Sequence, residues 1–97
     1  MIYPHTELGD RVSLAPNVMI ITQWHPIGPP GQRTALLERR PVRIGSGSTV
    51  NAGSIILAGC TIGEGCVVLS GTRVTRSLPA HCVVAGDPAR IVRRLGS

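Results

Sequence analysis

The 97-residue sequence contains very few large aromatic side chains. Phenylalanine is absent, and tryptophan and tyrosine occur once each. A globular core of this size normally uses several large aromatic residues, so we expect a narrow interior filled by aliphatic and small side chains. The scarcity of aromatics leaves no ladder on which nucleic-acid bases could stack, and none of the common nucleic-acid-binding motifs occurs. We therefore expect no nucleic-acid partner.

Long apolar runs and disulfide patterns are also missing. The sequence has no run of about 20 apolar residues, which predicts no membrane span. Its first residues lack the basic and then apolar pattern of a secretory signal. Three cysteines occur, an odd number that suits a reducing cytoplasm better than a disulfide framework. Together these features favour a cytoplasmic location and one domain, residues 1–97.

Lysine is absent, so the basic residues of the chain are ten arginines, against five acidic residues and a net charge of +5. Five of the arginines follow residue 72: Arg73, Arg76, Arg90, Arg93 and Arg94. Arginine binds phosphate through a planar, bidentate fork. This cluster therefore indicates a site for a phosphorylated ligand, with a solvated basic surface as the alternative.

An aliphatic residue recurs every six positions in the second half of the chain, at Ile44, Val50, Ile56, Ile62, Val68 and Val74. A small residue follows each of the first five after four positions: Ser48, Ser54, Cys60, Cys66 and Thr72. Neither a helix nor a half-buried strand has this period, which is typical of a hexapeptide parallel β-helix. Three hexads would form one triangular coil, with the aliphatic residues at its inner corners. Cys60 and Cys66 are then expected to pack inside as small hydrophobic residues.

A weaker version of the repeat runs upstream, at Ile2, Leu8, Leu14 and Ile20. We therefore predict coils over residues 2–25 and 44–79, separated by an excursion loop over 26–43. The loop holds four of the eight prolines, and its eighteen residues equal three hexads, so the chain can rejoin the stack in register. Proline at position 88 and a basic last turn predict a short C-terminal helical segment over 88–95.

The predicted stack is small and has two open ends. Its buried aliphatic corners must offset the conformational entropy of the whole chain, and burial is marginal at this size. We therefore expect the chain to associate, as a homotrimer.

The motifs that surround the hexads are more specific than the hexads themselves. They are APNV at 15–18, the dipeptide His25-Pro26, the sequence PVRIG at 41–45 and the closing VAGDPARIV at 84–92. In this combination the chain resembles the hexapeptide-repeat O-acetyltransferases, in particular the maltose, galactoside and nodulation-factor acetyltransferases, over residues 8–95. The resemblance implies an all-β, single-stranded left-handed parallel β-helix. It also implies transfer of an acetyl group from acetyl-CoA to a hydroxyl of a sugar or small molecule.

The resemblance also implies roles for individual residues. His25 would be the general base that takes the proton of the acceptor hydroxyl, since imidazole titrates near neutral pH. Acetyl-CoA would bind at residues Ala52, Ser70, Thr75, Arg76, Arg90 and Arg93. Thr75, Arg76, Arg90 and Arg93 would contact the adenosine end and its phosphate. Ala52 and Ser70 would hold the pantetheine arm through backbone groups, and the sites would lie between neighbouring subunits.

The sequence departs from the family pattern at several places. Thr49 stands where the family often has tryptophan, and Ala52 where it often has serine. Trp24 stands where close relatives often have a small residue, and it could either line the cleft or fill a gap in the core. Relatives also carry a helical segment and a further coil before Leu8, which leaves the acceptor undefined. Arg33 could line the acceptor pocket or be solvated.

One alternative to an acetyltransferase remains open. The chain could be a noncatalytic or truncated trimeric β-helix scaffold that still binds CoA. A three-histidine metal site is disfavoured because His5, His25 and His81 are far apart in the sequence, so we expect no metal and expect His5 and His81 to be exposed. Cys82 lies outside the recognised repeat, and the sequence suggests no role for it.

Overall fold

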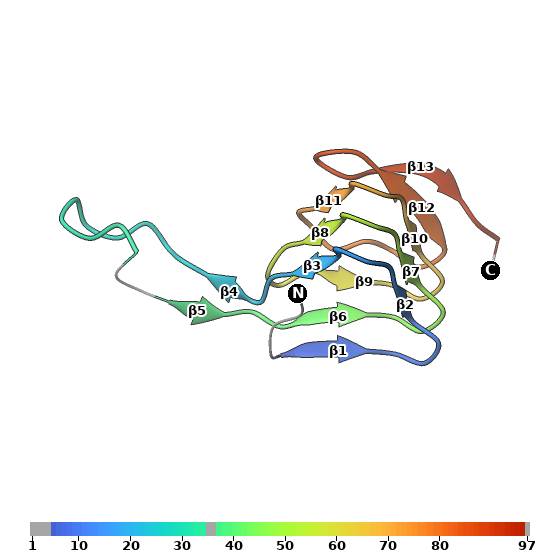
Figure 1. Ribbon diagram of the computed structural model, residues 1–97, viewed down its shortest axis with the longest axis horizontal. Coiled ribbons are helices and arrows are strands. Elements are labelled where there is room, and N and C mark those ends of the chain that lie inside the picture. Colours follow the sequence, from blue (N-terminus) through green and yellow to red (C-terminus); the bar gives the residue numbers. More distant parts are fainter. Residues whose placement is uncertain (1–4, 35–36, 97) are drawn as a thin grey trace.

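The computed structural model describes residues 5–34 and 37–96, and every element in them is a β-strand. Three short sheets form the sides of a triangular stack (Figure 1). The first sheet contains β1 (Thr6–Leu8), β6 (Val42–Ile44) and β9 (Thr61–Ile62). The second contains β2 (Ser13–Leu14), β7 (Thr49–Val50), β10 (Val67–Val68), β12 (Cys82–Ala85) and β13 (Arg90–Arg94). The third contains β3 (Met19–Ile20), β8 (Ile55–Ile56) and β11 (Arg73–Val74).

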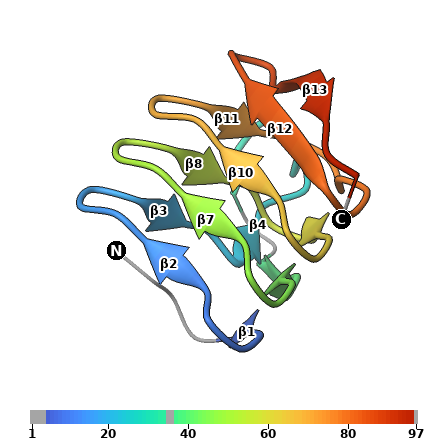
Figure 2. The ribbon, with the colours of Figure 1, turned by 90° about the vertical axis from the view of Figure 1, so that its right-hand side faces the viewer.

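Successive coils pair in parallel and lie one above the other (Figure 2). The six-residue repeat puts its aliphatic residues inside this stack, as predicted, because each coil turns three times and returns to the same corner. Each of the six aliphatic residues between Ile44 and Val74 is at most 2% exposed. The small residues beside them are buried too. Ser48, for example, donates to the Gly63 carbonyl at 2.9 Å and accepts from the Cys66 amide at 3.1 Å. These bonds satisfy a hydroxyl that would otherwise be costly to bury.

The upstream hexads belong to the same stack. Leu8 pairs with Ile44, Leu14 with Val50 and Ile20 with Ile56, so the chain rejoins the coils in register after its excursion. Leu8 is 47% exposed because it lies on the first described coil, which has no described strand below it. Ile2 falls outside the described residues.

The excursion begins and ends in an antiparallel pair, β4 (Gln23–Trp24) with β5 (Glu38–Arg39). Between these strands the chain extends away from the stack as an arm (Figure 1). The molecule is correspondingly long, with principal extents of 50 × 24 × 23 Å. Val42, which the sequence analysis included in the excursion, is fully buried and already belongs to the coil.

The predicted C-terminal helix is wrong. Residues 90–94 form β13, which pairs antiparallel with β12, and the chain reverses at the turn that contains Gly86 and the cis Asp87–Pro88 peptide. Pro88 therefore belongs to a tight turn and does not start a helix. Two adjacent β-branched residues, Ile91 and Val92, suit the strand better than a helix.

Cys82 proves to continue the repeat, contrary to its assignment outside it. One coil is two residues shorter than the others, because Ile62 pairs with Leu78 and Val68 with Val84. Cys82 consequently occupies the small inward position next to Cys66. Its side chain is fully buried, and the two Sγ atoms are 3.6 Å apart.

Alkaline conditions should destabilise the fold through Cys82. Burial, with a smaller effect of the neighbouring Cys66, raises the pKa of Cys82 from 9.0 to about 11. A raised folded-state pKa means that the fold favours the protonated thiol, so this stabilisation is present below pH 9 and is lost as the pH rises toward 11. We expect the melting temperature to fall less steeply over this range in Cys82→Ala than in the wild type. Equal slopes in thermal melts would contradict the prediction.

Candidate functional site

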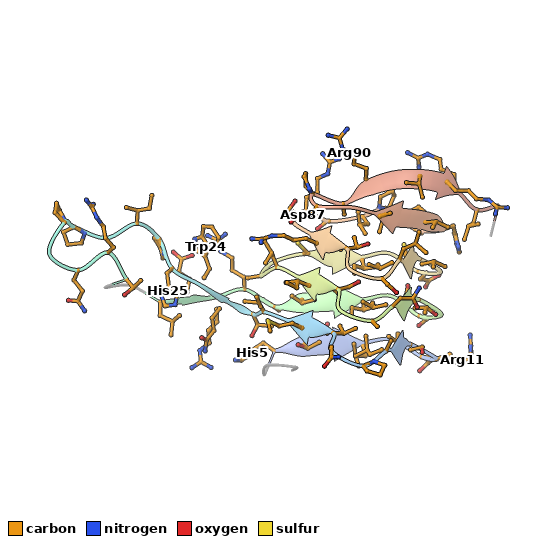
Figure 3. The ribbon with its side chains drawn as sticks, turned by 45° about the horizontal axis from the view of Figure 1, so that its top comes forward. His5, Arg11, Trp24, His25, Asp87 and Arg90 are labelled. Atoms are coloured by element: carbon orange, nitrogen blue, oxygen red, sulfur yellow. The ribbon has the colours of Figure 1, made fainter. Side chains whose placement is uncertain are left out.

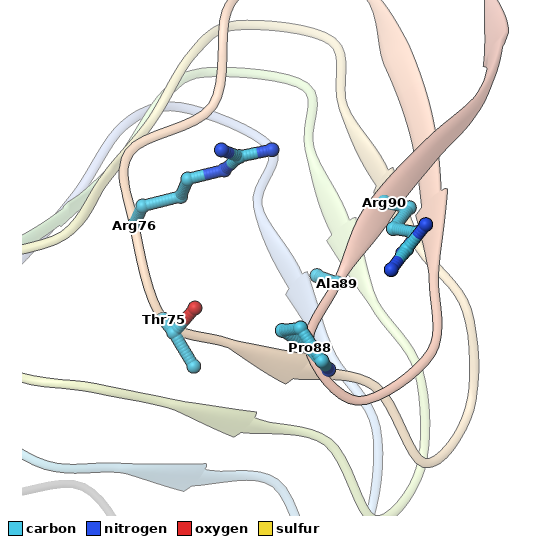
Figure 4. A pocket seen from close by; sticks show the side chains of 5 residues that line it. All are labelled: Thr75, Arg76, Pro88, Ala89 and Arg90. Atoms are coloured by element: carbon cyan, nitrogen blue, oxygen red, sulfur yellow. The ribbon is translucent and has the colours of Figure 1, made fainter.

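A pocket of about 340 Å³ lies at the C-terminal end of the stack, lined by Thr75, Arg76, Pro88, Ala89 and Arg90 (Figure 4). Its walls come from two segments, the corner that follows β11 and the turn between β12 and β13. Backbone hydrogen bonds join them, since the Ala89 amide donates to the Arg73 carbonyl and the Arg73 amide donates to the Gly86 carbonyl, both at 2.9 Å. These bonds hold the turn beside β11, an edge strand of the third sheet. Arg90 consequently lies across the pocket from Arg76 (Figure 4).

The charge of this pocket is positive. Arg73 forms an ion pair with Asp87 at 4.0 Å beside the pocket, while Arg76 and Arg90 take part in none of the ion pairs found among residues 5–34 and 37–96. Both guanidinium groups and the Thr75 hydroxyl can therefore donate to an anionic ligand. This chemistry suits a phosphate group. The structure brings together three of the six residues expected to bind CoA.

The other three expected CoA-binding residues lie outside the pocket. Arg93 is exposed on β13, opposite Val83 of β12. Ala52 and Ser70 are exposed corner residues of successive coils, and Ser70 lies at the opposite end of β11 from Thr75. The Ala52 carbonyl accepts a hydrogen bond from the Gly71 amide at 2.9 Å.

His25 directly follows β4 at the base of the arm, and its side chain is exposed. Within one chain the structure does not bring it to the arginine pocket. Figure 3 shows His25 on the arm and Arg90 at the far end of the stack. A reaction that used both groups would need a second chain or a long ligand.

Trp24 does not fill a gap in the core, which excludes one of the two roles considered for it. Its side chain is 44% exposed, and the Arg40 guanidinium lies over the indole ring, 5.0 Å from its centroid. Arg40 also donates to Glu38 at 2.9 Å. Its backbone bridges two coils, because the Arg40 amide donates to Thr22 and its carbonyl accepts from Gly59. These contacts fix the base of the arm.

The remaining candidate residues have structural environments. Cys60 and Cys66 are buried in the core, as predicted. His5 is exposed, as predicted, whereas His81 is half-buried because its ring packs over Gly65. Arg33 donates to the Gly28 carbonyl within the arm at 3.2 Å. In the described part of the chain, no three His, Cys, Asp or Glu side chains are grouped so as to hold a metal ion.

A second hollow, of about 410 Å³, was not anticipated from the sequence. It lies along the sheet of β1, β6 and β9 and includes the corner glycines Gly9, Gly45 and Gly63. Its rim carries the ion pair between Glu7 and Arg43, 2.9 Å apart. A Cβ atom at Gly45 would lie 2.6 Å from the Glu64 amide nitrogen, so glycine is needed for this close approach of two coils. The sequence signal for this hollow is the set of glycines Gly9, Gly45 and Gly63, which occupy the same corner of successive coils.

Comparison with known proteins identifies the repeat and its relatives. Residues 41–76 match the family model described as bacterial transferase hexapeptide (six repeats). Nodulation protein L of Rhizobium meliloti (strain 1021) is 43% identical over 84 residues, which cover 87% of this chain and 46% of that protein. The resemblance stated from the sequence is thus confirmed.

Two solved structures are similar along nearly the whole chain. A maltose O-acetyltransferase from Clostridium difficile 630 superimposes with a TM-score of 0.87 at 39% identity, covering 95% of this chain and 49% of that one. A galactoside acetyltransferase in complex with coenzyme A gives a TM-score of 0.89 at 30% identity, covering 98% and 48%. The coil stack is therefore a left-handed parallel β-helix, as the resemblance implied.

The chain spans about half the length of the curated relatives it matches, 46% in the case of nodulation protein L. No helix among the described residues is long and apolar enough to cross a membrane.

Proposed function

We propose, from its similarity to the hexapeptide-repeat O-acetyltransferases, that this chain transfers an acetyl group from acetyl-CoA to a hydroxyl of a sugar or other small acceptor. The supporting observation is the pocket formed by Thr75, Arg76 and Arg90. Two guanidinium groups and a hydroxyl converge there at the positions that the resemblance assigns to the adenosine end of CoA. The donor set fits a phosphate group.

In the proposed reaction His25 is the general base. Its imidazole accepts the proton of the acceptor hydroxyl while the hydroxyl oxygen attacks the thioester carbonyl carbon. The carbon–sulfur bond then breaks, the ester is released, and the proton passes from the imidazolium to the CoA thiolate. No covalent intermediate on the protein is needed. The three cysteines accordingly have no catalytic role, and all of them are buried.

We propose that the active form is a homotrimer whose sites lie between subunits. In one chain His25 is on the arm and the arginine pocket is at the far end of the stack (Figure 3). The arm also exposes apolar surface, with Ile27 88% exposed. A neighbouring subunit would cover this surface and bring its own pocket near His25. Three free cysteines are in keeping with the reducing cytoplasm as its location.

Removing either arginine of the pocket should weaken CoA binding. We expect Arg76→Ala and Arg90→Ala each to raise the dissociation constant of CoA about 10- to 100-fold, because a hydrogen bond to a charged group contributes about 1.5–3 kcal/mol. Isothermal titration calorimetry measures this change. Arg43→Ala is the matched control, since Arg43 is paired with Glu7 on another face. Unchanged affinity in both pocket variants would show that CoA does not bind there.

The activity itself is tested by thiol release from acetyl-CoA with a panel of sugars and small hydroxyl compounds. Acceptor-dependent release supports the transferase. CoA binding without turnover of any acceptor would support the noncatalytic β-helix scaffold instead.

A further inference from the structure

We propose that the acceptor carries a negative charge, as a carboxylate or a phosphate, and that Arg39 binds this group beside His25. The inference rests on the proposed acetyl transfer and specifies the class of acceptor. It concerns the β4–β5 pair at the base of the arm, which the CoA pocket does not include.

Arg39 and His25 share one face of this strand pair. The register pairs Gln23 with Arg39 and Trp24 with Glu38. Side chains of directly opposed residues lie on the same face, and successive residues alternate between faces. Gln23 and Arg39 therefore project to one side, and Trp24 and Glu38 to the other. We infer that His25, one residue beyond β4, continues the alternation on the side of Arg39. In Figure 3 the Trp24 and His25 side chains leave the strand in opposite directions.

Arg39 and Arg40 are neighbours in the sequence but differ in their ion pairing. Arg40 is paired with Glu38 at 2.9 Å and lies over the Trp24 ring. Arg39 instead places its Nη1 atom 3.3 Å from Nε2 of His5. A guanidinium group only donates hydrogen bonds, so Nε2 of His5 is the acceptor in this contact. His5 thus orients Arg39 without neutralising it.

Arg39 takes part in no ion pair within the described part of the chain, so its guanidinium, beside the proposed general base, is suited to hold an anionic acceptor. Arg39 uses one contact for His5, which leaves further N–H donors for a bidentate bond to a carboxylate or phosphate. Diagonal neighbours in an antiparallel pair are about 7–8 Å apart or less. A sugar acid or sugar phosphate can span such a distance, with its anionic group on Arg39 and a hydroxyl at His25.

The test compares acceptors that differ only in charge. The thiol-release assay is run with glucose, glucuronate and glucose 6-phosphate, and with glycerol, glycerate and glycerol 3-phosphate. We expect the wild type to have at least about 10-fold higher kcat/KM for the anionic members. In Arg39→Gln, KM for the anionic acceptors should rise about 10- to 100-fold, while the neutral acceptors change less than about twofold. Comparison of the carboxylate acceptors with the phosphate acceptors shows which anion is preferred.

Arg40→Gln is the matched control, because it removes an adjacent arginine that faces the other side of the pair. It should keep the preference for anionic acceptors, and Arg39→Lys should restore part of it. Equal use of neutral and anionic acceptors by the wild type, or an unchanged preference in Arg39→Gln, would overturn the assignment while the acetyl transfer stands.

If no acceptor releases thiol, the proposed function fails, and binding then decides the role of Arg39 separately. Isothermal titration calorimetry measures this binding without requiring turnover. Titration with glucuronate and glucose 6-phosphate in the presence of CoA should show saturation in the wild type and weaker binding in Arg39→Gln. Identical titrations of the two proteins, or no response in either, would overturn the proposal.

Discussion

Replacement of His25 by alanine is expected to lower kcat for acetyl transfer about 10²–10⁴-fold, the range that a positioned general base contributes. The affinity for CoA should stay within about twofold of the wild type, because His25 lies on the arm and is not among the residues that line the arginine pocket. Thiol release measures kcat, and calorimetry measures CoA binding on the same preparations. A loss confined to kcat indicates a role in the chemical step.

His81→Ala is a suitable control for this variant, since His81 packs over Gly65 in the coil stack and away from the arm. It should keep kcat within about twofold. A His25→Ala protein with wild-type kcat would exclude His25 as the base. Mixed oligomers extend the experiment: combining His25→Ala with Arg76→Ala should restore activity if one subunit supplies the base and its neighbour the pocket. No recovery in mixed oligomers would contradict a site shared between subunits.

The coil stack could be predicted from the sequence because its period is set by covalent geometry. Every sixth side chain returns to an inner corner, so the requirement for an aliphatic residue recurs in the sequence without interruption. Ile56 shows the result, being fully buried between Ile20 of one neighbouring coil and Val74 of the other. The weak upstream repeat could be placed in the same stack because the excursion equals a whole number of hexads.

Glycines with a positive φ follow a second six-residue period. Glycines with positive φ occur at Gly47, Gly53, Gly59, Gly65 and Gly71, one at each successive corner. Arg11 and Asn17 adopt the same left-handed conformation on the preceding coil, at φ values of 54° and 62°. Glycine is favoured there because other residues rarely adopt this backbone conformation. This pattern would have located the corners from sequence alone.

The C-terminal features were harder to predict because they depend on tertiary contacts. The coil that is two residues short hides Cys82 from a search for a strict period, although the residue is in the core. The proline-containing turn has the composition of a helix start, but the Ala89 and Arg73 backbone bonds fix it on the third sheet instead. Sheet pairing with β12 and the β-branched residues Ile91 and Val92 together favour a strand over the helix that the proline suggested.

Only part of the candidate site could be predicted from the sequence of one chain. Thr75, Arg76 and Arg90 come together because the β12–β13 turn docks beside the corner after β11. His25 and that pocket are separated, and no property of a single sequence states how two copies are placed. The contact of Arg40 with Trp24 depends on the register of β4 and β5, which the sequence does not specify.

Ile56→Ala should cause the largest loss of stability among single core substitutions of this type. We expect the free energy of unfolding to fall by about 2–5 kcal/mol, since truncation of a buried isoleucine removes its transfer free energy and leaves a cavity. Leu8→Ala is the matched control: Leu8 occupies the same position of the repeat but is 47% exposed. The loss of unfolding free energy in Leu8→Ala should be less than about half of that in Ile56→Ala. Urea unfolding at one protein concentration measures both, because association contributes to the apparent stability.

The position of Ile56 makes this substitution informative about function as well. A coil stack is stabilised mainly by contacts between adjacent repeats, so a defect in a middle coil weakens the connection between its two ends. Val74, which packs above Ile56, directly precedes Thr75 of the arginine pocket. Saturating CoA should therefore recover part of the lost stability, because a ligand that binds only the folded state stabilises it. Equal losses in Ile56→Ala and Leu8→Ala would mean that the inner corners do not carry the stability of this fold.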